Sequence, residues 1–548
     1  MINWIKSGAP WVWLTGGAVS ISLISVLGLL LLIGWKGLTY FWPAPLYQWQ
    51  DNSGHRLIGQ LYDHDEVPLS HLHIDKLHLS KAIKQKGSVE RLHIKIANRE
   101  RNTADFVSVL GIDLSKPSRP KDWAVIDRER NGQFYGRPVQ YVLANGHTTA
   151  DIGPNLQQGM QQAADIRRKI DDLIQHKIGD LGQKIERLQR EKRRLQLNDQ
   201  FTPNQQREIE LEKTRLDNQL SLAENHVDEL RKHLGMQALI LEDMTGQRVA
   251  IPVKQILRFW YPNQLTWTEK VTHWAKGVWL FLSEKPRESN SEGGVFPAIF
   301  GTILLVLLMS IVVMPLGIVA AVYLHEYAKD NAFTRMIRVA VINLAGVPSI
   351  VYGVFGLGFF VYTIGGSIDK LFFADRLPAP TFGTPGLLWS ALTLAVLTLP
   401  VVIVATEEGL SRIPYSIRHG SLALGATQFE TVWRIVLPMA SPAMITGLVL
   451  AVARAAGEVA PLMLVGVVKL ASNLPVDEQF PYLHLERKFM HLGFHIYDLG
   501  FQSPNIEAAR PLVYATAFLL VAVIITLNLT AISIRNNLRE KFRTLGQD

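Results

Sequence analysis

The chain has 548 residues, of which 48% are hydrophobic and 19% are charged, and its formal net charge is +8. This length exceeds one ordinary domain, and so many apolar residues beside so many charged ones predict a membrane part joined to a water-soluble part. The absence of cysteine excludes disulfides, thiolate metal sites and cysteine catalysis, and no basic stretch interleaved with aromatic residues indicates nucleic-acid binding.

Six stretches are apolar enough to cross a bilayer, which requires about 20 residues of helix. They are residues 11–35, 295–324, 339–365, 386–406, 438–467 and 511–534. The first stretch is longer than the apolar core of a signal peptide, and bulky residues follow it instead of a small-residue cleavage site. We therefore interpret residues 1–42 as a retained N-terminal transmembrane anchor helix.

Lysine and arginine are more frequent in the loops on one side of the predicted membrane. Ten occur in the 59 residues of 325–338, 407–437 and 535–548, and six occur in the 63 residues of 366–385 and 468–510. By the positive-inside rule this bias predicts cytoplasmic termini. The long polar insert 43–290 then lies outside, since long domains cross a membrane largely regardless of charge.

The insert begins and ends with short segments of alternating apolar and polar residues that predict strands. They are residues 92–97, 106–110, 123–127, 139–143 and 248–253. Asn131-Gly132 and Thr245-Gly246 are typical of the turns between paired strands.

Between these segments, apolar residues recur at spacings of three and four over residues 158–236, a pattern that predicts helices. Thr202, Pro203 and Gln205 predict the start of a second helix, with Thr202 as N-cap and Gln205 completing a capping box. Two long helices joined by a short turn predict an antiparallel coiled-coil hairpin. The hairpin could be a structural arm or spacer, or a docking arm for a binding protein or partner subunit.

The segment 407–437, on the predicted cytoplasmic side, carries the strongest functional signal. Pro414 can begin a short helix and Gly425 can end it in a left-handed conformation. Thr427 and Glu430 form a capping-box pattern for a second short helix. A helical elbow of this kind can seat in a motor protein and transmit its movement.

This elbow resembles the EAA-loop signature of bacterial type I ABC importer permeases. Gly425, Ile435, Leu437 and Pro438 match the signature, whereas His419-Gly420-Ser421 stands where the family has Glu-Ala-Ala. The chain also resembles the PstA-type permease of phosphate transport systems over residues 294–545 and the first span, most closely at 453–462. Val404 stands where that family usually has an arginine.

The resemblance implies an all-α polytopic membrane protein with six transmembrane helices and the type I ABC importer permease fold. Residues 291–548 would form the permease core with five of these helices, and the large periplasmic insert would be an α+β domain containing the coiled-coil hairpin. Contact with an ATPase is implied for six residues of the elbow and the helix after it. They are Leu422, Ala423, Gly425, Ala426, Leu437 and Pro438.

The resemblance further implies a second permease subunit of the PstC type, a dimeric cytoplasmic ATPase of the PstB type and a periplasmic phosphate-binding protein of the PstS type. The chain itself has no Gly-x-x-x-x-Gly-Lys-Ser/Thr phosphate loop, so we expect no ATPase site and no cofactor in it. ATP and Mg²⁺ would bind the partner ATPase. Uptake of another oxyanion, or a sensor or scaffold built on a permease core, are the alternatives.

Arg454 and Glu458 are charged residues inside the fifth predicted span, and their spacing places them on one helix face. A charge facing lipid is costly, so we expect the two side chains to face the helix bundle and to pair. A structural ion pair and a place on the substrate path are both compatible with the pattern, and the resemblance points to the substrate path.

Two weaker groups of polar residues remain. Glu326, Glu407 and Glu408 lie at cytoplasmic helix ends, where we expect solvation or contacts with the elbow. The sequence also places two histidines four residues apart beside other polar residues, and we favour an interfacial loop there over a metal site. The residues are His484, Glu486, His491 and His495.

Overall fold

The computed structural model describes residues 9–71, 87–102, 105–233, 235–287, 292–503 and 506–544. The chain divides into two compact units. The membrane unit comprises Met1–Tyr40 and Phe281–Asp548, and the insert unit comprises Phe41–Leu280. The boundary at Leu280 falls within helix α7 (Trp267–Ser283).

The membrane unit is built mainly of helices. In chain order its elements are α2 (Ala9–Thr39), β11 (Pro286–Arg287), β12 (Glu292–Gly293), α8 (Phe296–Val322), η7 (Tyr323–Tyr327), α9 (Ala332–Leu344), α10 (Ser349–Phe355), η8 (Gly356–Gly365), α11 (Gly366–Phe372), η9 (Ala374–Arg376), α12 (Leu387–Ser411), α13 (Tyr415–Ala423), α14 (Gln428–Thr431), η10 (Val432–Val436), α15 (Leu437–Gly457), α16 (Ala460–Val465), α17 (Leu492–Tyr497), η11 (Asp498–Gln502) and α18 (Ile506–Thr544).

Six of the described helical segments are long and apolar enough to cross a membrane, which confirms the number of spans predicted from the sequence. They are Trp11–Thr39, Phe296–Tyr327, Ser349–Phe372, Leu387–Ser411, Gln428–Gly457 and Ala509–Asn537. The fourth span is the most enclosed, with 67% of its apolar window buried, whereas the window of the first has no buried residue. Helix α12 is therefore the centre of the unit, and α2 presents its sides to the surroundings.

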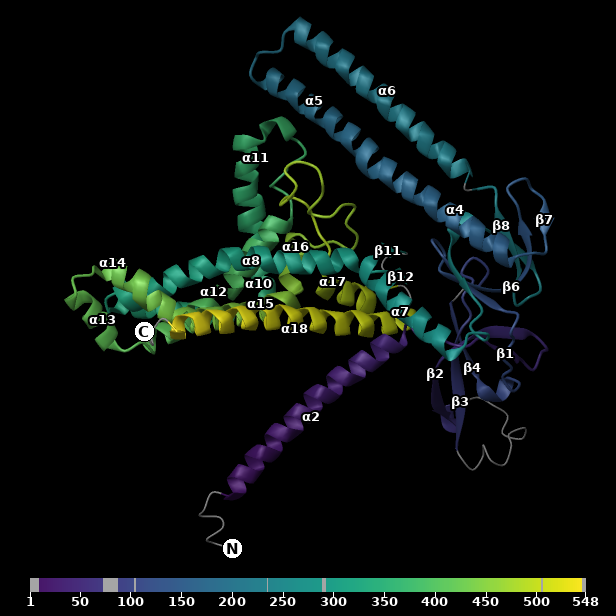
Figure 1. Ribbon diagram of the computed structural model, residues 1–548, viewed down its shortest axis with the longest axis horizontal. Coiled ribbons are helices and arrows are strands. Elements are labelled where there is room, and N and C mark those ends of the chain that lie inside the picture. Colours follow the sequence, from purple (N-terminus) through teal and green to yellow (C-terminus); the bar gives the residue numbers. More distant parts are fainter. Residues whose placement is uncertain are drawn as a thin grey trace. The chain divides into compact units, whose positions relative to one another are not determined.

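The core of the membrane unit lies between α8, α12 and α15, where apolar side chains such as Met309, Leu394 and Ala451 are fully enclosed. Small residues allow α12 and α15 to approach closely, because a Cβ atom on Gly447 would stand 2.8 Å from the Cβ of Ala405. The short helices α13 and α14 lie at one end of this bundle, and β11 and β12 lie at the other (Figure 1).

Four of the predicted span boundaries are wrong, since the third span is Ser349–Phe372 instead of 339–365 and the fifth is Gln428–Gly457 instead of 438–467. A proline explains the start of the third span and the end of the fifth. The third span begins at Ser349 instead of residue 339, because Pro348 separates it from the preceding helix α9. The fifth span ends at Gly457 instead of residue 467. Pro461 has no N–H to bond the carbonyl of Gly457, and in a continuous helix its ring would clash with that carbonyl.

The insert unit contains two antiparallel sheets and a helical arm. Its strands are β1 (Tyr47–Gln50), β2 (Arg56–Pro68), β3 (Ser88–Lys95), β4 (Phe106–Leu110), β5 (Ala124–Arg128), β6 (Gln133–Val142), β7 (Thr148–Thr149), β8 (Ala238–Glu242), β9 (Arg248–Pro252) and β10 (Ile256–Trp260). Three short 3-10 turns, η1 (Leu69–His71), η3 (Gly111–Asp113) and η5 (Val253–Gln255), lie between strands. One sheet has the order β1-β2-β3-β4, and the other has the order β10-β5-β6-β8-β9, with β7 paired to β6.

The structure confirms strands at the five predicted places, although β6 begins six residues earlier than its predicted start at 139. Pro138 hides the earlier part of β6 from the sequence pattern, because a proline breaks the pattern of a strand and here lies at a register shift. The turn at Asn131-Gly132 is confirmed, with φ angles of 64° and 66°. Strands β1, β2, β7, β8 and β10 were not predicted.

The helical arm consists of α4 (Gly153–Asp172), the π-helical turn η4 (Leu173–Ile178), α5 (Gly179–Leu197) and α6 (Pro203–His233). Helices α5 and α6 lie side by side and are joined by a short turn (Figure 1). Leu181, Leu216 and Ala223 are buried along the seam between the two legs of the arm. The predicted cap of α6 is present, since Thr202 N–H donates to Oε1 of Gln205 over 3.1 Å.

Candidate functional site

The elbow of the membrane unit is formed by α13, the turn at Gly425 and α14. Gly425 has a φ of +91°, a left-handed conformation that ends α13 and that a residue with a Cβ adopts only with strain. The hydroxyl of Thr427 accepts from the N–H of Glu430 over 3.3 Å, and Oε2 of Glu430 accepts from the N–H of Thr427 over 3.0 Å. The capping box predicted here is therefore confirmed, and both sides of the turn have a fixed geometry.

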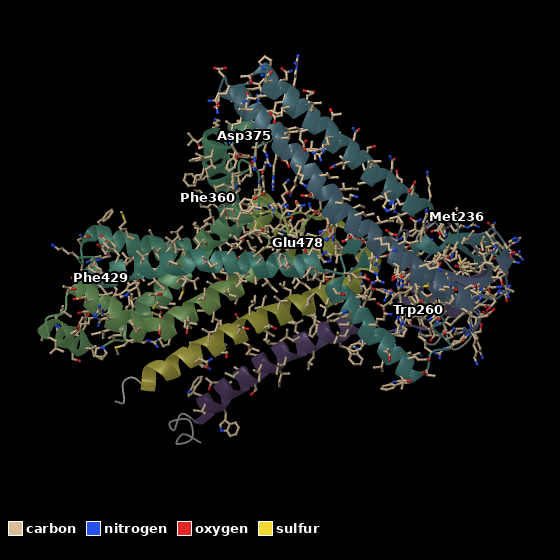
Figure 2. The ribbon with its side chains drawn as sticks, turned by 45° about the horizontal axis from the view of Figure 1, so that its top comes forward. Met236, Trp260, Phe360, Asp375, Phe429 and Glu478 are labelled. Atoms are coloured by element: carbon tan, nitrogen blue, oxygen red, sulfur yellow. The ribbon has the colours of Figure 1, made fainter. Side chains whose placement is uncertain are left out.

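The elbow exposes large apolar side chains. Exposed fractions are 43% for Leu422, 91% for Leu424, 66% for Phe429 and 64% for Trp433. The rings of Phe429 and Trp433 stack with centroids 6.2 Å apart, and Figure 2 shows Phe429 at the end of the bundle that carries the elbow. Such a cluster is costly in water, so this surface requires cover, and Phe429 and Trp433 also belong to the candidate membrane span Gln428–Gly457.

The six residues predicted to contact an ATPase divide into two groups. Leu422, Ala423 and Gly425 are exposed on the elbow, and Ala426 beside them is half-buried. The other two, Leu437 and Pro438, form the first residues of α15 and are half-buried. The elbow surface is thus made by residues before and after Gly425, and Phe429 and Trp433 belong to it although the sequence pattern did not single them out.

A buried arginine fastens α13 to the bundle. Arg418 donates from Nη2 to Oε1 of Glu326 over 2.9 Å, and from Nε to the same oxygen over 3.2 Å. It also donates to the main-chain carbonyls of Leu410 and Ile413, over 2.8 Å and 2.6 Å. The side chains of Arg418 and Glu326 are only 9% and 10% exposed. One guanidinium therefore holds the elbow helix to the ends of both α8 and α12.

The glutamates expected at solvated helix ends have three different environments. Glu326 is largely enclosed by the elbow, which confirms the predicted contact, and its main-chain carbonyl also accepts from the side-chain amide of Gln428 over 2.9 Å. Glu407 is half-buried, with Oε1 3.6 Å from Nε of Arg338, and Glu408 is exposed. Contact with the elbow is therefore made by Glu326.

Arg454 and Glu458 lie at the break between α15 and α16, with Nε of Arg454 3.5 Å from Oε1 of Glu458. The predicted pairing is confirmed, but the prediction that both residues lie on one helix is wrong, because Glu458 follows the last helical residue and has an extended ψ of 135°. The side chains are 32% and 19% exposed. The guanidinium is therefore partly exposed, and its position near a helix C-terminus suits a cation.

The histidines after α16 fall into two separate environments. His484 contacts carboxylates on both ring nitrogens, Oδ1 of Asp477 over 3.0 Å and Oε1 of Glu486 over 3.2 Å. His491 and His495 are buried, and burial lowers the pKa of each to about 4. No group of three or more metal-ligating side chains occurs in the described part of the chain.

The buried His491 and His495 predict an acid-sensitive fold. Because their pKa values are near 4 when folded and near 6.5 when unfolded, the unfolded state binds more protons as the pH falls below 6.5. The free energy of unfolding should have its full value above pH 6.5 and should be lower by about 2 kcal/mol per histidine at pH 5. Thermal unfolding at pH 7.5 and 5 tests this. His495→Gln should remove about 2 kcal/mol of the loss at pH 5. The shares of His491 and of His273, whose pKa burial also lowers to about 4, should remain. The exposed control His419→Gln should preserve the whole acid effect, and an unchanged acid effect in His495→Gln contradicts the prediction.

Comparison with known proteins identifies the family. Residues 313–544 match the model of the binding-protein-dependent transport system inner membrane component. The chain is 30% identical over 256 residues to the probable ABC transporter permease protein YqgI of Bacillus subtilis (strain 168), covering 46% of this chain and 81% of that protein. The insert unit lies outside the matched residues 313–544.

Two further relatives carry the name of one transport system. The chain is 34% identical over 260 residues to the phosphate transport system permease protein PstA 1 of Mycobacterium tuberculosis (strain CDC 1551 / Oshkosh), covering 47% of this chain and 76% of that protein. It is 31% identical over 252 residues to PstA of Yersinia pestis, covering 46% and 76%. A chain of the solved MetNI methionine ABC transporter shares 17% identity, with a TM-score of 0.32, over 47% of this chain and 96% of that chain.

The chain belongs to the family of binding-protein-dependent transport system inner membrane components, the permeases of ABC importers, whose permease subunits are not ATPases. Within this family its relatives of the PstA type confirm the resemblance that the motifs at 407–437 and 453–462 indicate. With its six apolar helices it is a multi-pass membrane protein.

Proposed function

We propose that this chain is the permease subunit of an ATP-driven phosphate importer and that it forms the transmembrane path together with a second permease of the PstC type. The observation that carries the proposal is the partly exposed Arg454–Glu458 pair at the helix break that ends the fifth span. The names of the PstA relatives support phosphate as the substrate.

The chemistry of the pair suits transient binding of an oxyanion. A guanidinium has planar, always charged donors that match phosphate oxygens. At 3.5 Å from Oε1 of Glu458, Nε of Arg454 lies beyond good hydrogen-bond distance, so the carboxylate competes with an anion without blocking the guanidinium. A carrier must release what it binds, and the competing Glu458 favours release. Val404, half-buried on α12, carries no charge. A second cation on the substrate path would therefore come from the partner permease.

Energy would enter through the elbow. Leu422, Leu424 and the stacked rings of Phe429 and Trp433 form an apolar surface that fits a pocket of a dimeric PstB-type ATPase, which would bind ATP and Mg²⁺. Because Arg418 joins α13 to the ends of α8 and α12, movement of the elbow would be transmitted to two helices of the bundle.

The remaining assignments concern position. We place the protein in the bacterial inner membrane with cytoplasmic termini and the insert 43–290 in the periplasm, where a PstS-type phosphate-binding protein would deliver substrate. The excess of Lys and Arg in the loops beside the elbow supports this orientation. The apolar seam between the legs of the arm supports a coiled-coil hairpin within 158–236.

The test is uptake of labelled phosphate by vesicles that contain this chain with its partner permease, ATPase and binding protein. We expect uptake that requires ATP and that excess unlabelled phosphate inhibits more strongly than sulfate or molybdate. If the vesicles take up sulfate or molybdate in preference to phosphate, that oxyanion is the substrate and phosphate is not. An assembled complex whose ATPase activity is independent of the loaded binding protein would favour the sensor or scaffold.

A further inference from the structure

The far end of the helical arm carries a concentration of positive charge. We call residues 187–207, which include the end of α5, the turn and the start of α6, the arm tip. The arm tip holds six basic and two acidic residues. They are Arg187, Arg190, Lys192, Arg193, Arg194 and Arg207, with Glu191 and Asp199.

The rest of the arm has no such excess. Residues 153–186 hold five basic and five acidic residues, and residues 208–233 hold four basic and seven acidic residues. Ion pairs join many of these charges, such as Lys184 with Asp180 over 2.7 Å and Arg231 with Asp228 over 3.3 Å. Balanced, paired basic and acidic residues are enough to keep a helix surface solvated. The excess of positive charge at the arm tip therefore requires another explanation.

Most cations of the arm tip lack an acidic partner. Arg190 is 4.0 Å from Glu186 and Lys192 is 3.8 Å from Glu210, both long contacts. The other four arginines are exposed, and none of them forms an ion pair with a described residue. They are Arg187, Arg193, Arg194 and Arg207.

The arm tip also exposes one large apolar side chain. Leu197, the last residue of α5, is 50% exposed. Arg187 and Arg194 are seven residues apart and share one face of α5, whereas Arg193 lies on a different face and Arg207 belongs to α6. A protein partner would need its acidic groups fixed in a matching array on several sides. Lipid headgroups can rearrange around such a tip while their acyl chains accept the leucine.

We propose that the arm tip docks on a membrane surface rich in anionic phospholipids. Clusters of four to eight basic residues suit such surfaces, at about 1 kcal/mol for each cation near the headgroups. Arginine can bind lipid phosphates through two parallel hydrogen bonds. The unbroken helical run from Gly153 to Leu197 measures about 67 Å, at 1.5 Å per residue, so the tip can meet a surface well away from the sheets of the insert unit.

The experiment uses the full chain in nanodiscs of phosphatidylcholine, mixed with free vesicles that are then floated on a density gradient. We expect the protein to float with vesicles of phosphatidylcholine and phosphatidylglycerol in a two-to-one ratio and not with vesicles of phosphatidylcholine alone. High salt should release it, because the attraction is electrostatic. Glutamine at the four exposed arginines of the arm tip should weaken the binding at least about tenfold.

The matched control removes four positive charges from the body of the arm, by Arg168→Gln, Lys177→Gln, Lys184→Gln and Arg215→Gln, and should bind as the unmodified chain does. Circular dichroism checks that both variants keep their helices. Equal binding by the arm-tip variant, or equal binding to phosphatidylcholine vesicles, overturns the proposal. So does a chain that ignores anionic vesicles but loses its partner subunits when the tip is neutralised, since the tip would then be a protein contact.

Discussion

Replacing Arg454 with glutamine is expected to reduce phosphate uptake strongly while the transporter still assembles. The substitution keeps a hydrogen-bond donor at the break between α15 and α16 but removes the charge that can neutralise an oxyanion. A hydrogen bond to a charged group contributes about 1.5–3 kcal/mol, so the uptake rate should fall by roughly 10–100-fold from this contact alone. Labelled-phosphate uptake into vesicles, with co-purification of the partner subunits, measures both properties.

Two further variants separate charge from geometry at this pair. Arg454→Lys keeps the charge but loses the planar, two-pronged donor, so we expect intermediate uptake. Glu458→Gln removes the competitor 3.5 Å from the guanidinium, which should tighten phosphate binding and slow its release. The apparent affinity should therefore rise while the maximal rate falls, an opposite shift that a purely structural ion pair does not produce.

The matched control is Arg535→Gln on α18. Arg535 is half-buried in the same unit, 3.4 Å from the hydroxyl of Thr446, and its removal changes the net charge equally. Uptake should remain close to that of the unmodified chain. If Arg454→Gln transports at the unmodified rate, or if Arg535→Gln is equally defective, the pair has no specific place on the substrate path.

The sequence could predict the parts of this fold that depend on local composition. Long apolar runs identify six spans, and Gly425, Thr427 and Glu430 predict the elbow because each residue type has one strong conformational or capping preference. The same local rules should have placed the start of the third span and the end of the fifth, since Pro348 and Pro461 can be read from the sequence. The hydrophobic run continued across both prolines and hid the breaks.

The rest of the site depends on contacts between residues far apart in the chain. Arg418 precedes an unremarkable polar stretch, and Glu326 is 92 residues away, so no spacing rule connects them. The exposed rings of Phe429 and Trp433 resemble interior residues until the tertiary structure shows which face of the elbow they occupy. Strand β2 also escaped prediction, because its many charged and polar residues conceal a pairing set by β1 and β3.

Replacing Arg418 with methionine is expected to uncouple the elbow from the bundle. The change removes the hydrogen bonds from α13 to Glu326 and to the carbonyls of Leu410 and Ile413, and leaves the carboxylate of Glu326 with the ring of His325, whose Nδ1 is 3.1 Å from Oε1, in place of the guanidinium. Breaking a buried ion pair by removing one partner costs about 3–5 kcal/mol, enough to detach the elbow from α8 and α12 locally. Basal ATP hydrolysis by the assembled complex should persist, whereas its stimulation by substrate-loaded binding protein should be lost.

A double variant tests whether coupling of the elbow to the bundle requires the Arg418–Glu326 ion pair itself or only a firmly held α13. Replacing both partners of a buried pair by apolar residues is often neutral, so Arg418→Met with Glu326→Met should recover much of the stability that Arg418→Met loses. The carbonyls of Leu410 and Ile413 would lose the bonds from Arg418, although Leu410 keeps the N–H of Ile413 over 3.2 Å. Helix α13 would therefore still be loosely held, and stimulation should return only in part. The control Arg412→Met changes an exposed arginine of the same segment. In this variant the loaded binding protein should stimulate ATP hydrolysis normally. Full stimulation in Arg418→Met alone would mean that the elbow transmits force without this arginine.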